Sequence, residues 1–166
     1  MRILGIDPGT WKMGIGVVEK DAQGYRAIHY ETLLLKGPRD HFTLAQRLKK
    51  IYDGLNEIFK IYQPDVVALE DLFYAQNFQA ACRIGEARAV AILAATNFDI
   101  KVAEYAPTRV KQAISGSGQA SKVQIQYTVR HLLKLKENPA SDAADALAVA
   151  LCHGQSLKIK EYVRLS

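Results

Sequence analysis

The chain has 166 residues, of which 49% are hydrophobic, and carries 22 Lys and Arg against 17 Asp and Glu, a net charge of +5. This length suits one domain. No apolar stretch approaches the about 20 residues that a membrane-spanning helix needs, which excludes that class of protein. The first residues lead into a strand-like segment without signal-peptide features, so we expect a soluble, cytoplasmic protein. The basic excess favours a polyanionic partner such as nucleic acid.

Three apolar, β-rich segments come first, over residues 2–7, 13–18 and 25–35. Short turns separate them, which predicts neighbouring antiparallel strands. A helix is then predicted up to Pro64, because apolar residues recur every three or four positions and Thr43 with Gln46 has the spacing of a capping box.

The rest of the chain alternates strands and helices. Two further strands are predicted at 66–69 and 100–105, and helices at 77–97, from Pro107, at 121–134 and at 141–152. This order predicts an α/β domain over residues 1–153 with a five-stranded mixed sheet, three antiparallel strands and then two parallel ones, and helices on both faces. The basic residues 154–166 are predicted to form a flexible tail.

Four acidic residues stand where these predicted elements meet. Asp7 ends the first strand, Glu70 follows the fourth, and Asp142 and Asp145 lie on one face of the last helix. The first and fourth strands are neighbours in the predicted sheet, so we expect these carboxylates to meet beside the start of the last helix. Turn formation, solvation or the helix dipole explains each acid taken singly. Together, however, the carboxylates would repel one another unless they bind cations. Their hard oxygen atoms suit magnesium or manganese.

The chain resembles the RuvC family of bacterial crossover junction endonucleases, which has an RNase H-like fold. The resemblance rests on five segments in the expected order, LGIDPG at 4–9, ALE at 68–70, GEARAVA at 85–91, VKQ at 110–112 and SDAADALA at 141–148. It spans nearly the whole chain up to about His153. Each motif alone is weakly specific, and their order and spacing carry the resemblance.

The resemblance implies a set of site residues. Asp7, Glu70, Asp142 and Asp145 match the family's catalytic acidic residues, which bind magnesium. The position of Asp142 carries His in some relatives. The resemblance thus implies two magnesium ions per subunit, with manganese as a substitute, activating water to leave a 5′-phosphate and a 3′-hydroxyl.

The resemblance also implies DNA contacts. Phe73 stands where the family has an aromatic residue that stacks on junction bases, but a core or dimer position fits it equally well. Lys111 and Lys122 match basic positions near the scissile phosphate, although a solvated surface role also fits Lys122. Candidates for contacts to backbone phosphates are Arg83, Arg88 and Arg109.

Further implications concern partners. The resemblance implies a homodimer that nicks two strands of like polarity in a four-way DNA junction, in cooperation with a RuvA–RuvB branch-migration complex. The Ala-rich helix at 77–97 offers small, apolar surface that suits either a two-fold dimer or close packing on its own sheet.

Other readings of the sequence are open. Residues 5–10 are similar to the phosphate loop of actin-like ATP-binding proteins, but these need two domains and a second such loop. A catalytically inert junction-binding protein would have lost one of the acids. Another RNase H-like nuclease, acting on RNA–DNA hybrids or belonging to the YqgF-like proteins, is the third alternative.

Overall fold

The computed structural model describes residues 1–36, 42–71 and 78–164, with side chains through residue 157. Its strands form one sheet in the order β3-β2-β1-β4-β5. β1 pairs with β2 and β2 with β3 in antiparallel fashion, whereas β4 runs parallel to both β1 and β5. The predicted mixed sheet is confirmed. The strand bounds are β1 Arg2–Asp7, β2 Lys12–Asp21, β3 Gly24–Leu34, β4 Val66–Glu70 and β5 Lys101–Tyr105.

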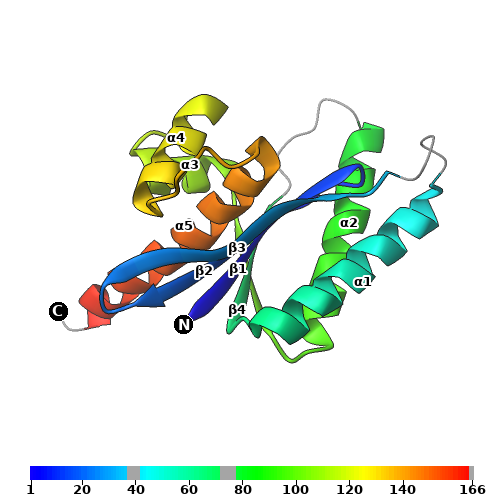
Figure 1. Ribbon diagram of the computed structural model, residues 1–166, viewed down its shortest axis with the longest axis horizontal. Helices are drawn as coiled ribbons and strands as arrows, with labels where there is room; N and C mark the ends of the chain where they lie inside the picture. The colour runs from blue at the N-terminus through cyan, green and yellow to red at the C-terminus, as the bar shows by residue number, and fades with distance from the viewer. Residues whose placement is uncertain (37–41, 72–77, 165–166) are drawn as a thin grey trace.

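Helices cover both faces of this sheet (Figure 1). α1 and α2 lie on one face, and α5 lies on the other with α3 and α4 beside it. Each face therefore has its own layer of buried side chains, supplied alternately by the central strands. The helix bounds are α1 Leu44–Tyr62, α2 Phe78–Thr96, α3 Pro107–Ser115, α4 Lys122–Leu132 and α5 Ser141–Arg164.

Local signals fix where several helices begin. Thr43 and Gln46 form the predicted capping box of α1, with the Thr43 N–H donating to the Gln46 side chain at 2.8 Å. Ser121 and Gln124 cap α4 in the same way, and Pro107 occupies the first turn of α3. These signals are local, so the sequence predicted them well.

The last helix differs from the prediction. It was expected to end near Cys152, but α5 continues without a break to Arg164. Gly154 was read as the start of a tail, yet a Cβ atom there would lie 2.5 Å from the Cε1 atom of Tyr25. The glycine therefore allows close packing against β3 rather than ending the helix.

Among the residues that the structure describes, no helix combines the length and the apolar character needed to cross a bilayer.

Candidate metal and DNA site

Two carboxylates meet at one edge of the sheet because β1 and β4 are parallel neighbours. Ile6 is paired with Leu69, so Asp7 and Glu70, the next residues, leave the two strands side by side. The preceding residues of both strands are buried, which fixes the strand ends in place. The predicted meeting of these two side chains is confirmed.

A third carboxylate reaches this edge because α5 packs unusually close to the sheet. A Cβ atom at Gly5 would lie 1.9 Å from the carbonyl oxygen of Ala146, and one at Gly14 would lie 2.0 Å from that of Asp142. Only glycine permits such contact between a strand and a helix backbone. The first turns of α5 therefore reach the end of β1 and bring Asp145 beside Asp7.

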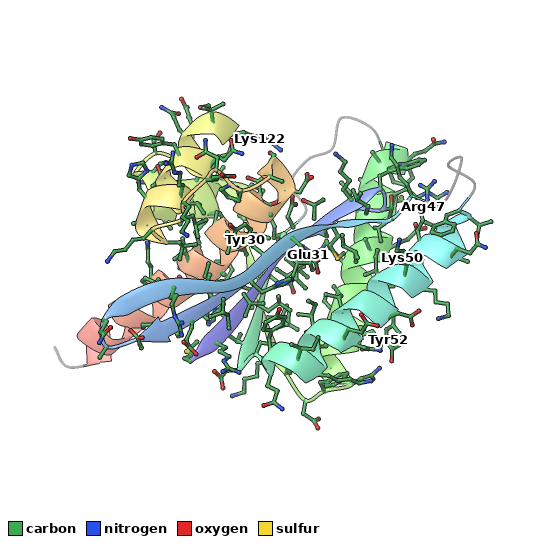
Figure 2. All side chains as sticks on the ribbon, viewed as in Figure 1. Tyr30, Glu31, Arg47, Lys50, Tyr52 and Lys122 are labelled. Carbon is green, nitrogen blue, oxygen red and sulfur yellow. The ribbon has the colours of Figure 1, made fainter. Side chains whose placement is uncertain are left out.

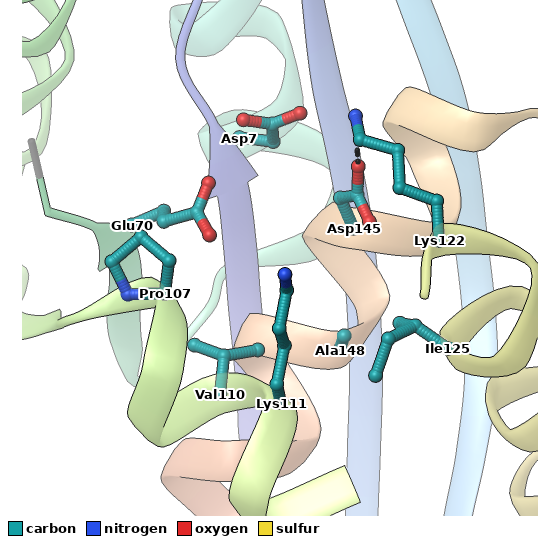
Figure 3. Close-up of a pocket in the computed structure, with 9 residues that line it drawn as sticks. All are labelled: Asp7, Glu70, Pro107, Val110, Lys111, Lys122, Ile125, Asp145 and Ala148. Carbon is teal, nitrogen blue, oxygen red and sulfur yellow. Dashed lines mark hydrogen bonds and ion pairs between the residues drawn. The ribbon is translucent and has the colours of Figure 1, made fainter. Parts of the chain in front are cut away.

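The three carboxylates line one pocket of about 220 Å³ (Figure 3). Lys111 from α3 and Lys122 from α4 line the same pocket, with Lys111 between Glu70 and Asp145 and Lys122 beside Asp145 (Figure 3). The Lys122 Nζ atom lies 3.3 Å from Oδ2 of Asp145. Apolar side chains complete the wall of the pocket, namely Pro107, Val110, Ile125 and Ala148.

Burial and neighbouring negative charges disfavour the ionised forms of these carboxylates. Burial, followed by the charges of Glu70 and Asp145, raises the pKa of Asp7 from 3.8 to about 8. Burial also raises the pKa of Glu70 and of Asp145, although Lys122 partly offsets the rise for both. The interaction between the two side chains further raises the pKa of Asp7 and lowers that of Glu70, so the two carboxyl groups titrate as a pair. Such a cluster favours a bound cation.

These donors suit a hard divalent cation in chemistry and charge, since all are carboxylate oxygens in a confined space. Within residues 1–36, 42–71 and 78–157, however, no three Asp, Glu, His or Cys side chains already stand together as a ligand set. In Figure 3 the Asp145 carboxylate is paired with Lys122, at 3.3 Å. A cation there would compete with the Lys122 ammonium for Asp145.

Comparison with known proteins gives the family. The chain matches the family described as crossover junction endodeoxyribonuclease RuvC over residues 3–153. The chain belongs to the RuvC family. A RuvC protein of Desulforamulus reducens is 50% identical over 156 residues, covering 93% of this chain and 94% of that relative.

Solved RuvC structures match the fold closely. The Thermus thermophilus RuvC structure superposes with a TM-score of 0.86 and 34% identity, covering 96% of this chain and 97% of that one. T. thermophilus RuvC in complex with Holliday junction substrate superposes with a TM-score of 0.85 and 31% identity, covering 96% of each chain. The RNase H-like architecture of this RuvC protein is thus shared along almost its whole length.

The remaining predicted site residues of this RuvC chain lie in different surroundings. Asp142 does not line the pocket, but its charge acts on both Asp145 and Lys122. Arg83 is exposed and lies 3.0 Å from Glu86, and Arg109 lies over the Tyr105 ring at 5.7 Å. Contacts of Arg83 and Arg109 with DNA stay predictions.

The predicted base-stacking residue, Phe73, lies outside the described residues. Both roles that the sequence leaves open for Phe73, stacking on DNA and packing within the protein, therefore stay predictions.

Arg88 has partners within the protein. It is only 8% exposed, and its guanidinium donates to the Glu70 carbonyl oxygen and to the Glu104 carboxylate, with Asp71 at 3.2 Å. These contacts anchor the end of β4 and so position the Glu70 side chain. The phosphate contact of Arg88 stays a prediction, and this guanidinium would have to leave partners inside the protein to make it.

Proposed function

We propose that this RuvC family member is a structure-selective endonuclease that resolves Holliday junctions by paired nicks during DNA recombination and repair. The observation that carries the proposal is the convergence of Asp7, Glu70 and Asp145 with Lys111 and Lys122 on one pocket. Family membership and the fold shared with a RuvC protein bound to a Holliday junction support the substrate class.

In this proposal Asp7, Glu70 and Asp145 hold magnesium, and manganese can replace it. Asp142 assists through its charge, from a position beside the pocket. Asp145 lies 3.3 Å from the Lys122 ammonium, so its carboxylate would turn from that partner toward the cation when a cation binds. Two bound cations would supply Lewis acidity toward water and toward the oxygens of the scissile phosphate.

The chain's own residues orient the reaction. The carboxylates of Asp7 and Glu70 leave rigid strand ends, so they fix the place of the phosphate. The ammonium groups of Lys111 and Lys122 face that place and offset the negative charge that grows as the bond breaks. Water adds to phosphorus and the 3′ oxygen departs with a proton, which leaves a 5′-phosphate and a 3′-hydroxyl.

The proposal includes a homodimer, because one pocket cuts one strand and resolution needs two symmetric cuts. The outer face of α2 supports a two-fold contact, since Phe78 is 81% exposed and Leu93 is 56% exposed. Cooperation with a RuvA–RuvB complex and a cytoplasmic location belong to the same proposal.

The test is a cleavage assay with magnesium that compares a four-way junction, a linear duplex and an RNA–DNA hybrid. We expect symmetric nicks in the junction and little cutting of the other two substrates. Asp7→Asn should bind the junction without cutting it. Asp53→Asn is the matched control, since it removes an exposed carboxylate on α1 that is paired with Lys49, and it should cut normally.

Two results would contradict the proposal. Cutting of the hybrid alone would assign the chain to another RNase H-like activity. Undiminished junction cutting by Asp7→Asn would show that this pocket is not the site of cleavage.

A further inference from the structure

A second cleft, of about 650 Å³, adjoins the carboxylate pocket. We call it the Trp11 cleft; it is lined by Pro8, Gly9, Thr10, Trp11, Lys12, Lys36, Ala80, Arg83 and Ile84. Pro8 follows directly after Asp7, which lines the carboxylate pocket. A single turn of the chain therefore forms a wall of both cavities.

The Trp11 cleft is strongly cationic. Its lining includes Lys12, Lys36 and Arg83, and no carboxylate is among the lining residues that the structure describes. Arg83 is balanced by Glu86 at 3.0 Å. Neither lysine forms an ion pair with any part of the chain described here, so both ammonium groups are available to an anion.

Trp11 is held in a fixed position within this cleft. The Arg47 guanidinium stacks 3.3 Å from the centroid of its ring, and the Lys36 ammonium lies 5.8 Å from that centroid. Arg47 is only 9% exposed and belongs to α1, which makes it a rigid support (Figure 2). The Leu35 N–H donates to the Trp11 carbonyl oxygen at 3.0 Å, so Lys36 is placed beside the ring.

The turn that carries Trp11 cannot easily move. A Cβ atom at Gly9 would lie 2.3 Å from the carbonyl oxygen of Lys12, so the backbone folds tightly back on itself. Thr10 is buried. Trp11 is nevertheless 47% exposed, which leaves about half of a large aromatic surface available to a ligand.

We propose that the Trp11 cleft binds an unpaired nucleotide next to the scissile phosphate, with the indole packing on the base and Lys12 and Lys36 binding phosphates. The proposal rests on the proposed function. An exposed, rigid aromatic ring between free cations is the combination that holds single-stranded nucleic acid. Because Pro8 in the lining of the cleft directly follows Asp7, the proposal assigns this contact to the strand that enters the carboxylate pocket.

The first test uses fluorescence, because Trp11 is the only tryptophan in the chain. Four-way junction DNA and single-stranded oligothymidylate are titrated separately into the Asp7→Asn protein, which binds without cutting. We expect tryptophan emission to be quenched along the same curve as the anisotropy of labelled DNA. Trp11→Ala in this background should weaken binding about 10-fold, and Trp11→Phe should restore most of it.

The second test distinguishes phosphate contacts made by the cleft lysines from the effect of the protein's overall positive charge. Lys12→Gln with Lys36→Gln should lower the slope of log binding constant against log salt by roughly 1.4 for oligothymidylate, as expected for two lost phosphate contacts on a single strand. The matched control is Lys60→Gln with Lys101→Gln, the same charge change at exposed positions toward the opposite end of the sheet. The control should keep the parent's slope.

The inference is overturned if the cleft variant keeps the parent's salt slope, or if Trp11→Ala binds as tightly as the parent. In proteins that retain Asp7, Trp11→Ala should raise the enzyme concentration needed for half-maximal cleavage by about 10-fold, in step with the weaker binding. Absence of junction cutting by the unaltered protein would instead count against the proposed function. In that case the binding of oligothymidylate would still test whether the Trp11 cleft binds single-stranded DNA.

Discussion

The Asp7→Asn substitution should stabilise this protein in the absence of divalent cations. Asp7 has its pKa raised from 3.8 to about 8 by burial and by the charges of Glu70 and Asp145. The folded protein therefore holds a proton on Asp7 that the unfolded chain releases. This contribution to stability is fully present below the unfolded value of 3.8 and is lost as the pH rises toward 8. Because Asn does not titrate, the variant does not lose this stability as the pH rises.

The magnitude follows from the two pKa values. Each pH unit between 3.8 and about 8 corresponds to about 1.4 kcal/mol, which sets an upper limit of about 6 kcal/mol. Because Asp7 and Glu70 titrate as a pair, part of this energy belongs to Glu70 and remains in the variant. We expect Asp7→Asn to exceed the parent by roughly 2–4 kcal/mol in unfolding free energy at about pH 8.

Urea denaturation in EDTA, followed by circular dichroism at about pH 5 and about pH 8, measures this difference. The advantage of Asp7→Asn should shrink at the lower pH. Added magnesium should stabilise the parent by about 1.4 kcal/mol for each tenfold excess over its dissociation constant, and the variant by less. Asp53→Asn serves as the control. A variant no more stable than the parent at about pH 8 would refute the claim that burial and the neighbouring carboxylates disfavour an ionised Asp7.

Three further substitutions test other parts of the site. Lys122→Gln should slow single-turnover junction cleavage about 100-fold with little change in binding, since it removes a cation facing the reacting phosphate; an unchanged rate would assign this lysine to the surface. Gly14→Ala should lower the unfolding free energy by about 1–3 kcal/mol in urea, because its Cβ atom would meet the carbonyl oxygen of Asp142 at 2.0 Å; a neutral effect would show that α5 can shift freely. Arg88→Met should cost about 1–3 kcal/mol by the same measurement, because carboxylates lose their partner, and it should slow cleavage without altering the salt dependence of binding, which a residue contacting phosphate would alter.

Much of the fold could be predicted because its signals are local. Strand alternation, the capping box at Thr43 and the proline that opens α3 each depend on a few neighbouring residues. The end of α5 could not be predicted in this way. Glycine lowers helix stability by about 1 kcal/mol relative to alanine, but Gly154 fits against Tyr25 from a strand far away in the sequence.

The same distinction between local signals and contacts of distant residues applies to the candidate site. Asp7 and Glu70 could be placed together from the sequence, since the order of strands predicted that β1 and β4 are neighbours. The inward turn of Arg88 could not, because its partners Glu104 and Asp71 come from separate segments. The support that Arg47 gives to Trp11 also joins α1 to the β1–β2 turn, and no spacing in the sequence signals it.

By itself the sequence determined the kinds of groups available to this protein, carboxylates at strand ends, flanking lysines and a basic surface, together with the order of elements that carries them. Only the tertiary structure decided which groups share a space and which neutralise each other. The physical reason is that pairing and repulsion between charges depend on distance and burial. Both are set by backbone contacts such as those at Gly5 and Gly14, which join residues more than a hundred positions apart.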